Sequence, residues 1–244
     1  MGVELTVLGC SGSYGAQPFG ACSGYLVRGG GAAVWVDCGN GTLPHLQQHA
    51  RIEDLSAVVL THQHPDHCAD IYGLHVLMRY GLERGGLPVF APEGLEERLG
   101  ALVDDWGDTF DWKVVGDGDG VELADLTLRF SRTDHPPPTY AVEVSADEKR
   151  LVYTADTGPD WTVGAFGAGA DLVLSEATYQ EGHKGVPWHL SAHEAGRDAR
   201  QADASRLILT HLWPELDAVV SVKEGSESFG EPVTLATPHL VTPV

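Results

Sequence analysis

The chain of 244 residues carries 35 acidic and 15 basic side chains, a net charge of −20, and 43% of its residues are hydrophobic. This length and composition fit one large globular domain with a sizeable core, and the charge argues against a surface that grips a long nucleic acid or an anionic membrane. The four cysteines form no C-x-x-C pair and no apolar run reaches the roughly 18 residues of a membrane span, so we expect free thiols in a cytoplasmic protein without a membrane segment.

The first part of the chain predicts strands separated by glycine-rich turns. Residues 3–9 alternate and then become apolar, which indicates an opening strand, and residues 24–28 and 32–39 fit a hairpin around the glycines at 29–31. The loop 9–15 is rich in Gly and Ser, but it has neither G-x-G-x-x-G nor the G-K-S/T of a P-loop. Nucleotide binding through those motifs is therefore not predicted.

The rest of the chain alternates between predicted strands and helices, and no linker, charge block or low-complexity tract divides it. Ser191 and Glu194 have the spacing of a capping box, so one helix is expected to begin just after Ser191. The pattern favours two packed sheets with helices outside, a four-layer αββα sandwich forming a single α/β (α+β) domain over residues 1–244. The predicted helices are 42–50, 69–84, 93–106 and 191–202, and the predicted later strands are 57–61, 87–92, 111–115, 121–123, 126–131, 139–145, 150–155, 171–177, 207–210, 232–236 and 239–243.

A dense group of possible metal ligands follows the predicted strand 57–61. It reads H-Q-H-P-D-H and contains His62, His64, Asp66 and His67. Imidazole nitrogen and carboxylate oxygen are the donors that zinc and similar ions take in proteins. His62 and His64 can point at one position from a loop that turns away from the strand, while Asp66 and His67 lie beyond the turn and can serve a second ion.

Further residues of the same type stand at the ends of other predicted strands. His135, Asp156 and His211 each come directly after, or at the end of, an apolar segment. Loops at strand ends build sites on a rigid scaffold, so we expect these side chains to meet the histidine group. As single residues they would carry little weight, but as a set in this order they predict a metal centre.

With these residues in place, the sequence resembles the metallo-β-lactamase superfamily over nearly the whole chain. The resemblance implies a pair of divalent metal ions, Zn²⁺ first, with Mn²⁺ or Fe²⁺ as alternatives because His and Asp ligands accept several metals. It also implies that Asp37 orders the metal loop without ligating. In this resemblance His62, His64 and His135 hold one ion, Asp66, His67 and His211 hold the other, and Asp156 bridges both.

The stretches SEATY and HLSAHEAG resemble the ribonuclease Z-like branch of that superfamily. The resemblance implies that Glu176 orients His189, and that His189 contacts the scissile phosphate or protonates the leaving group. Asp66 and Asp156 would hold the attacking hydroxide electrostatically. These assignments make Asp66, Glu176 and His189 the catalytic residues that we expect besides the metal ligands.

One departure from that branch narrows the expected substrate. Enzymes of the branch that process tRNA carry a long arm between the motifs matched by His135 and Asp156. Only 20 residues lie between these two positions here, and they predict two strands and a turn. The sequence therefore looks more similar to the small bacterial phosphodiesterases of the branch that open cyclic nucleotides.

We therefore expect a dinuclear metal-dependent hydrolase, a phosphodiesterase that cleaves a small cyclic nucleotide or related phosphodiester by a metal-activated hydroxide. Its partner would be a small anionic phosphodiester rather than a long nucleic acid or a membrane, and the resemblance implies a homodimer. Three alternatives stay open from the sequence: a ribonuclease Z-like RNA 3′-end nuclease, a lactone or thioester hydrolase of the same fold, and a metal-binding protein without catalysis.

Overall fold

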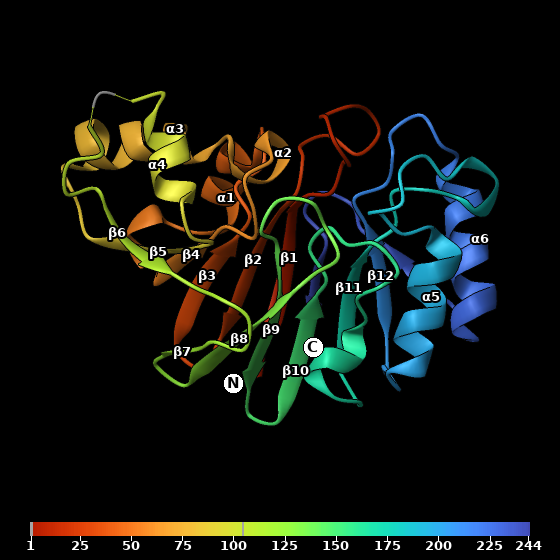
Figure 1. Cartoon of the computed structure of the whole chain (residues 1–244). Helices are drawn as coiled ribbons and strands as arrows, with labels where there is room; N and C mark the ends of the chain where they lie inside the picture. The colour runs from red at the N-terminus through yellow and green to blue at the C-terminus, as the bar shows by residue number, and fades with distance from the viewer. Residues whose placement is uncertain (1, 104) are drawn as a thin grey trace.

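A computed structural model describes residues 2–103 and 105–244 and forms two seven-stranded sheets with helices outside both (Figure 1). The strand order is β14-β1-β2-β3-β4-β5-β6 in the first sheet and β13-β12-β11-β10-β9-β8-β7 in the second. Helices α1 to α4 pack on the outer face of the first sheet, and α5 and α6 pack on the outer face of the second. The predicted αββα sandwich is confirmed.

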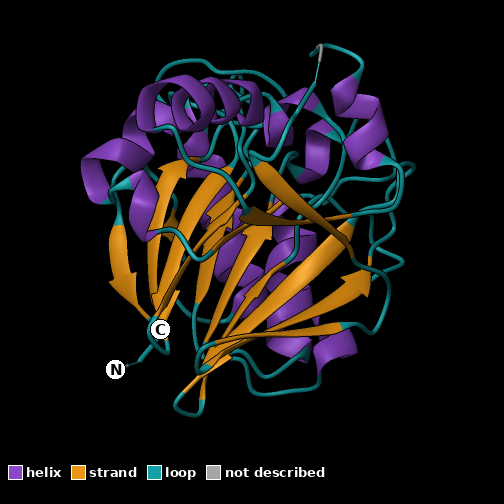
Figure 2. Cartoon of the chain, turned by 90° about the vertical axis from the view of Figure 1, so that its left-hand side faces the viewer, coloured by secondary structure: helices purple, strands orange, loops and turns teal. Residues whose placement is uncertain are grey.

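The first sheet and its helices hold the chain from residue 4 to residue 114, together with the last strand. That strand pairs antiparallel with the first, so the two ends of the chain lie side by side (Figure 2). The strands are β1 (Glu4–Gly9), β2 (Gly24–Gly29), β3 (Ala32–Val36), β4 (Ala57–Val59), β5 (Leu87–Ala91), β6 (Phe110–Val114) and β14 (Val241–Pro243), and the helices are α1 (Thr42–His49), α2 (Pro65–Cys68), α3 (Ile71–Val76) and α4 (Leu95–Gly100).

The second sheet and its helices hold the later part of the chain. The segment between His135 and Asp156 is the antiparallel hairpin β9–β10, as predicted, and it contains no arm. The strands are β7 (Gly120–Leu123), β8 (Leu126–Arg132), β9 (Tyr140–Ala146), β10 (Lys149–Tyr153), β11 (Leu172–Glu176), β12 (Leu207–Thr210) and β13 (Thr234–Leu235), and the helices are α5 (Ala192–Gln201) and α6 (Ala218–Phe229).

Two hydrophobic cores explain why the central strands are apolar on both faces. In β3, Val34 and Val36 join the core between the sheets, whereas Trp35 points the other way, into the core under the helices. Successive side chains of a strand alternate between faces, so a strand covered on both sides needs apolar residues throughout. None of the described helices is long and apolar enough to cross a membrane.

The strand directions decide where the loops meet. β3 and β4 are parallel, and so are β10, β11 and β12. β8 runs in the same direction as β10, because both are antiparallel to the strand β9 between them. The carboxyl ends of these strands therefore open at one edge of the sandwich, which lies at the top of Figure 1.

Two predicted helices differ in length from the observed ones. The helix predicted at 69–84 is α3 followed by π-helical turns over Leu77–Leu82. The helix predicted at 93–106 stops at Gly100, where the indole of Trp106 packs so closely that a Cβ on the glycine would lie 3.2 Å from its Nε1. Asp104, in the remainder of that prediction, lies outside the described residues.

The sequence analysis missed helix α6. Its valines, serines and internal glycine have weak helix propensity, which hides the element in a propensity count. The residues at its two ends are nevertheless typical of helix ends. Asp217 caps the first turn by accepting from the N–H of Val219, and Gly230 ends the helix in the left-handed conformation.

The core between the sheets makes a direct stability prediction. Leu151→Ala removes a side chain that is 1% exposed, so we expect the free energy of unfolding to fall by about 2–5 kcal/mol. The exposed Val219→Ala is the matched control and should stay within about 0.5 kcal/mol of the unmodified chain. Urea denaturation followed by circular dichroism measures both, and equal stabilities would contradict this account of the core.

Candidate metal centre

All seven residues predicted as metal ligands come together at the carboxyl edge of the two sheets. His62 and His64 lie in the loop after β4, and Pro65 starts the short helix α2 that carries Asp66 and His67. The three others, His135, Asp156 and His211, follow β8, β10 and β12. One sheet thus supplies the dense motif, and the other supplies the single residues.

The first group of donor atoms joins His62, His64, His135 and one oxygen of Asp156. His64 Nδ1 lies 3.0 Å from His62 Nε2 and 3.3 Å from His135 Nε2. Asp156 Oδ2 lies 3.5 Å from His62 Nε2 and 3.9 Å from His135 Nε2. Four donors therefore surround one position.

The second group joins Asp66, His67, His211 and the other oxygen of Asp156. Asp66 Oδ2 lies 3.2 Å from His211 Nε2 and 3.6 Å from His67 Nε2. Asp156 Oδ1 lies 3.2 Å from His67 Nε2 and 3.5 Å from His211 Nε2. The carboxylate of Asp156 thus contributes one oxygen to each group, which is the bridging position that the resemblance implied.

The hydrogen bonds on the far side of each ring fix its tautomer. Thr61 Oγ1 donates to Asp37, so it accepts from His62 Nδ1, and His67 Nδ1 donates to Asp37 over 2.7 Å. In both rings Nδ1 carries the proton, and Nε2 presents its lone pair to the centre. A hydrogen-bond acceptor behind the ring, on the side away from the metal, is usual for metal-bound histidines.

The two histidine ligands that follow strands of the second sheet, His135 and His211, are held in the same way. His135 Nδ1 donates to the carbonyl oxygen of Trp188 over 3.1 Å. Thr178 Oγ1 donates to Glu176, and it accepts from His211 Nδ1 over 2.9 Å. Four imidazole lone pairs therefore converge on the oxygens of two buried carboxylates.

This arrangement fits a pair of metal ions. His67 Nε2 and Asp156 Oδ1 are buried without a hydrogen-bond partner, a costly state unless a positive charge lies between them. The donor separations are close to the roughly 3.3–3.6 Å between two ligands of one tetrahedral zinc ion. The His and Asp donors suit Zn²⁺, Mn²⁺ and Fe²⁺ alike.

The pKa shifts agree with that requirement for positive charge. Burial lowers the pKa of His62 well below its usual value, so this ring stays neutral. Burial also acts on His67, but the nearby carboxylates of Asp156, Asp37 and Asp66 outweigh it and raise the pKa of that ring. The three carboxylates therefore surround His67 with negative charge, an environment that suits a bound cation.

Asp37 does not belong to either group of donors. It sits after β3 with a left-handed φ of 57° and accepts from Thr61 N, Thr61 Oγ1, His67 Nδ1 and the hydroxyl of Tyr153. Tyr153 comes from the second sheet, so this carboxylate ties both sheets to the metal loop. The geometry agrees with the positioning role that the sequence suggested.

The predicted pair Glu176 and His189 lies beside the same centre. Glu176 Oε1 is 2.9 Å from His189 Nδ1, and the ring of His189 stacks 5.7 Å from that of His211. Burial lowers the pKa of His189, but the charge of Glu176 and its hydrogen bond outweigh burial and raise that pKa to about 9. The contact with Glu176 therefore favours the protonated form of His189.

Residues that the sequence analysis missed complete the site. The backbone N–H of Ser13, in the loop after β1, donates to Asp66 Oδ2 over 3.0 Å. Thr178 connects the metal group to the acid pair, since its hydroxyl bonds both His211 and Glu176. Thr178 lies just after the parallel strand β11, whereas Ser13 lies in the Gly/Ser-rich loop after β1, whose neighbours are antiparallel.

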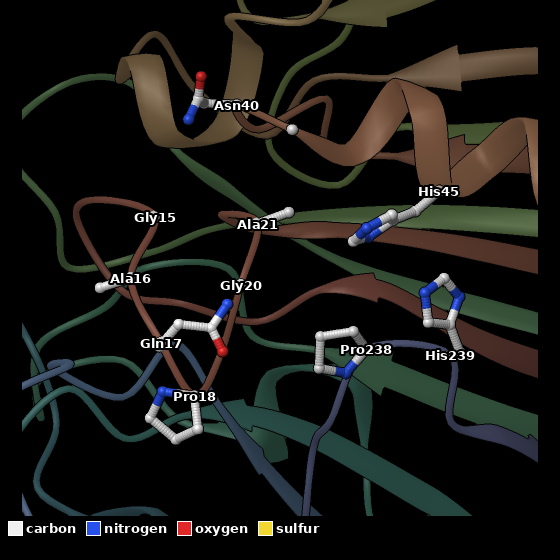
Figure 3. Close-up of a pocket in the computed structure, with 11 residues that line it drawn as sticks. Gly15, Ala16, Gln17, Pro18, Gly20, Ala21, Asn40, His45, Pro238 and His239 are labelled. Carbon is white, nitrogen blue, oxygen red and sulfur yellow. The ribbon is translucent and has the colours of Figure 1, made fainter.

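A separate cavity of about 780 Å³ lies beside the loop 15–21 (Figure 3), and none of the seven predicted ligands lines it. His45 and His239 are in its wall, and the Nδ1 atom of each has a partner. His45 Nδ1 lies 2.6 Å from the carbonyl oxygen of Leu8, and His239 Nδ1 lies 2.9 Å from His49 Nε2. Among the described residues that line this cavity there is no carboxylate, whereas two carboxylates face the rings of the metal centre.

Comparisons with known proteins agree with the geometry. The model of the Beta-lactamase superfamily domain matches residues 32–212. The protein ML1173 of Mycobacterium leprae is 37% identical over 243 residues, which cover 95% of this chain and 85% of that protein. The crystal structure of the metallo-beta-lactamase fold protein YhfI from Bacillus subtilis is 30% identical, with a TM-score of 0.89 over 99% of both chains. A ribonuclease Z of Mycobacterium bovis is 28% identical over 88% of this chain and 87% of its own.

Removing the metal should lower the melting temperature. When the free ion concentration is a thousandfold above the Kd, binding to the folded state adds about 4 kcal/mol to the free energy of unfolding. For a chain of this size, that corresponds to a rise of roughly ten degrees in the melting temperature. We expect a strong chelator to lower the melting temperature by about that amount, and His67→Ala, which removes a ligand of one ion, to reduce the response. His193→Ala, in α5, should keep it. Identical melting curves with and without chelator, for protein shown by mass spectrometry to have lost its metal, would contradict the assignment.

Asp37→Asn should weaken metal binding without removing a ligand. The amide offers His67 a weaker acceptor or a competing donor, so we expect about a ten- to hundredfold loss of metal affinity in competition with a chromogenic chelator. Asp54→Asn, on an exposed side chain, is the matched control and should bind normally. An unchanged affinity in the Asp37 variant would show that this carboxylate does not position the ring.

Proposed function

Since the chain belongs to the metallo-β-lactamase superfamily, we propose that its metal centre cleaves small phosphodiesters, with 3′,5′-cyclic nucleotides as the first candidates. The chain is a metal-dependent hydrolase. The observation that carries the narrower proposal is the pair Glu176–His189, in which a buried carboxylate holds an imidazole beside the bridging carboxylate Asp156.

The pair supports phosphate-ester chemistry because the leaving group of such an ester is an alkoxide that needs a proton. Glu176 is fixed by the N–H of Thr157 on one oxygen and by the hydroxyl of Thr178 on the other. It therefore holds His189 in one orientation and stabilises its charge. His189 can deliver its proton from Nε2, the nitrogen that faces away from Glu176.

The seven proposed ligands would hold the two ions, with Asp156 between them. When bound, two such ions supply an acidified water and neutralise negative charge on the reacting group. Asp66, fixed by the N–H of Ser13, is proposed to accept a hydrogen bond from the attacking water and so to orient it. His189 acts at the opposite end of the reaction, on the leaving oxygen.

Charge and shape support a small substrate. The net charge of −20 opposes the approach of a polyanion, so the attraction for a phosphate has to come from the metal centre itself. Most of the segment 136–155, which separates two of the ligands, forms the hairpin β9–β10. A mononucleotide diester needs no long arm to hold it.

The proposed activity has a direct assay. We expect metal-loaded protein to hydrolyse 3′,5′-cyclic AMP faster than a lactone or a precursor tRNA, which represent the competing carbon-ester and RNA activities. The precursor tRNA is included because one relative is a ribonuclease Z. Failure to hydrolyse any phosphodiester would reject the proposal, and faster cleavage of the lactone or of the precursor tRNA would favour that alternative.

The acid role of His189 makes a sharper prediction. His189→Ala should lower kcat for cyclic AMP by about 10²–10⁴-fold, the usual contribution of a general acid. The same variant should lose much less activity on a p-nitrophenyl diester, because p-nitrophenolate leaves without a proton. His193→Ala should be unaffected with both substrates. Equal losses of the His189 variant on the two substrates would show that the ring is needed for binding or structure and not as the acid.

A further inference from the structure

A row of aromatic rings leads from the metal centre to the surface. The ring of His189 lies 6.0 Å from that of Tyr179, and Tyr179 lies nearly parallel to Trp213 at 6.5 Å. Tyr14 meets Trp213 edge to face at 5.7 Å. These three residues, Tyr14, Tyr179 and Trp213, form what we call the aromatic row.

The loops that carry the row are fastened to one another. The N–H of Trp213 donates to the carbonyl of Thr178, and the N–H of Gly12 donates to the carbonyl of Leu212. At the outer end, the hydroxyl of Tyr14 donates to Glu215. Because the Thr178 hydroxyl also holds His211, the row is fixed relative to a proposed metal ligand.

The row is also accessible. Tyr14 is 40% exposed, and Tyr179 and Trp213 are half-buried rather than enclosed in a core. Large aromatic surfaces left partly open beside a reactive centre favour a ligand that covers them. What they offer is flat and uncharged, so it suits a planar ring more than a second phosphate.

We propose that the aromatic row is the nucleobase subsite of this enzyme, a proposal that rests on the phosphodiesterase function inferred above. Bases stack on Tyr and Trp whatever their sequence, since every base has a π-face. This acidic protein has few Lys and Arg side chains that could bind the sugar-phosphate. Stacking of the base is a source of affinity that does not depend on positive side chains. Within the row, Tyr179 lies next to His189 at 6.0 Å, and Trp213 lies one ring further out.

The test compares ligands with and without a base. Calorimetric titration of metal-loaded protein should show adenosine 5′-monophosphate binding about tenfold or more tightly than ribose 5-phosphate, the gain typical of one stacked base. Trp213→Ala should remove most of that difference and leave ribose 5-phosphate unchanged. Tyr14→Ala changes an exposed loop side chain, so it should reduce the affinity difference between the two monophosphates without unfolding the protein. Trp213→Phe keeps an aromatic ring, so it should retain the affinity difference that Trp213→Ala loses.

Kinetics give a second readout. Trp213→Ala should raise KM for cyclic AMP about tenfold and leave kcat nearly unchanged, because a base remote from the reacting bond binds equally in ground and transition states. The base-free methyl riboside cyclic phosphate should be hydrolysed equally well by both proteins. Tyr80→Ala, which removes an exposed ring on the π-helical turns far from the row in sequence, is the matched control.

The outcomes separate this proposal from the one it rests on. Equal affinity of the unmodified protein for the two monophosphates would overturn the base subsite, and so would equal losses on both in the Trp213 variant. A shift in oligomeric state of the Trp213 and Tyr14 variants with unchanged affinity would assign the row to a protein contact instead. A third outcome is that no phosphodiester is cleaved, but the protein binds adenosine 5′-monophosphate more tightly than ribose 5-phosphate and the variants lose this preference. In that case the phosphodiesterase proposal fails and the base subsite stands.

Discussion

The burial of Asp156 is the constraint on which the rest of the site depends. Its carboxylate is 2% exposed, and one of its oxygens has no hydrogen-bond donor, yet three imidazole nitrogens lie within 3.5 Å of its two oxygens. Removing a carboxylate from water costs several kcal/mol unless positive charge compensates it. The fold arranges imidazole lone pairs around the position where a cation would bind, and that cation would supply the positive charge. The centre therefore needs its metal ions to be complete.

Parallel strands make this convergence achievable with little backbone strain. Strands that run side by side end at the same edge, so one residue beyond each end falls near its neighbours without a long loop. Three of these residues, Asp37, Ala155 and His211, adopt left-handed φ angles of 50–57°. That conformation costs on the order of 1 kcal/mol for a residue with a Cβ, and it turns the chain sharply enough to keep the side chains together.

Much of the fold and of the metal centre could be predicted from the sequence, because both are encoded in local patterns. An apolar strand that ends in His or Asp can be recognised in the sequence without knowing which residues it contacts in the fold. The motif from His62 to His67 can be recognised from the spacing of its own residues. Thr178, Ser13 and the aromatic row were not predictable in this way. Their roles arise from contacts between loops far apart in the chain, and Ser, Thr and Tyr are too common for type alone to mark them. Helix α6 was hidden for a different reason, since its packing overrides its weak propensity.

Thr178 shows how these separate features act as one site. Its hydroxyl bonds both His211 and Glu176, and its carbonyl accepts from the backbone of Trp213. One side chain and its peptide group thus fix a proposed metal ligand, the carboxylate behind the proposed acid and the central ring of the aromatic row. A displacement of this residue would disturb all three together, so the position of the metal, the direction of proton delivery and the placement of a base are mechanically linked. This linkage is the physical reason to interpret the metal centre, the acid pair and the row as parts of a single substrate-binding surface.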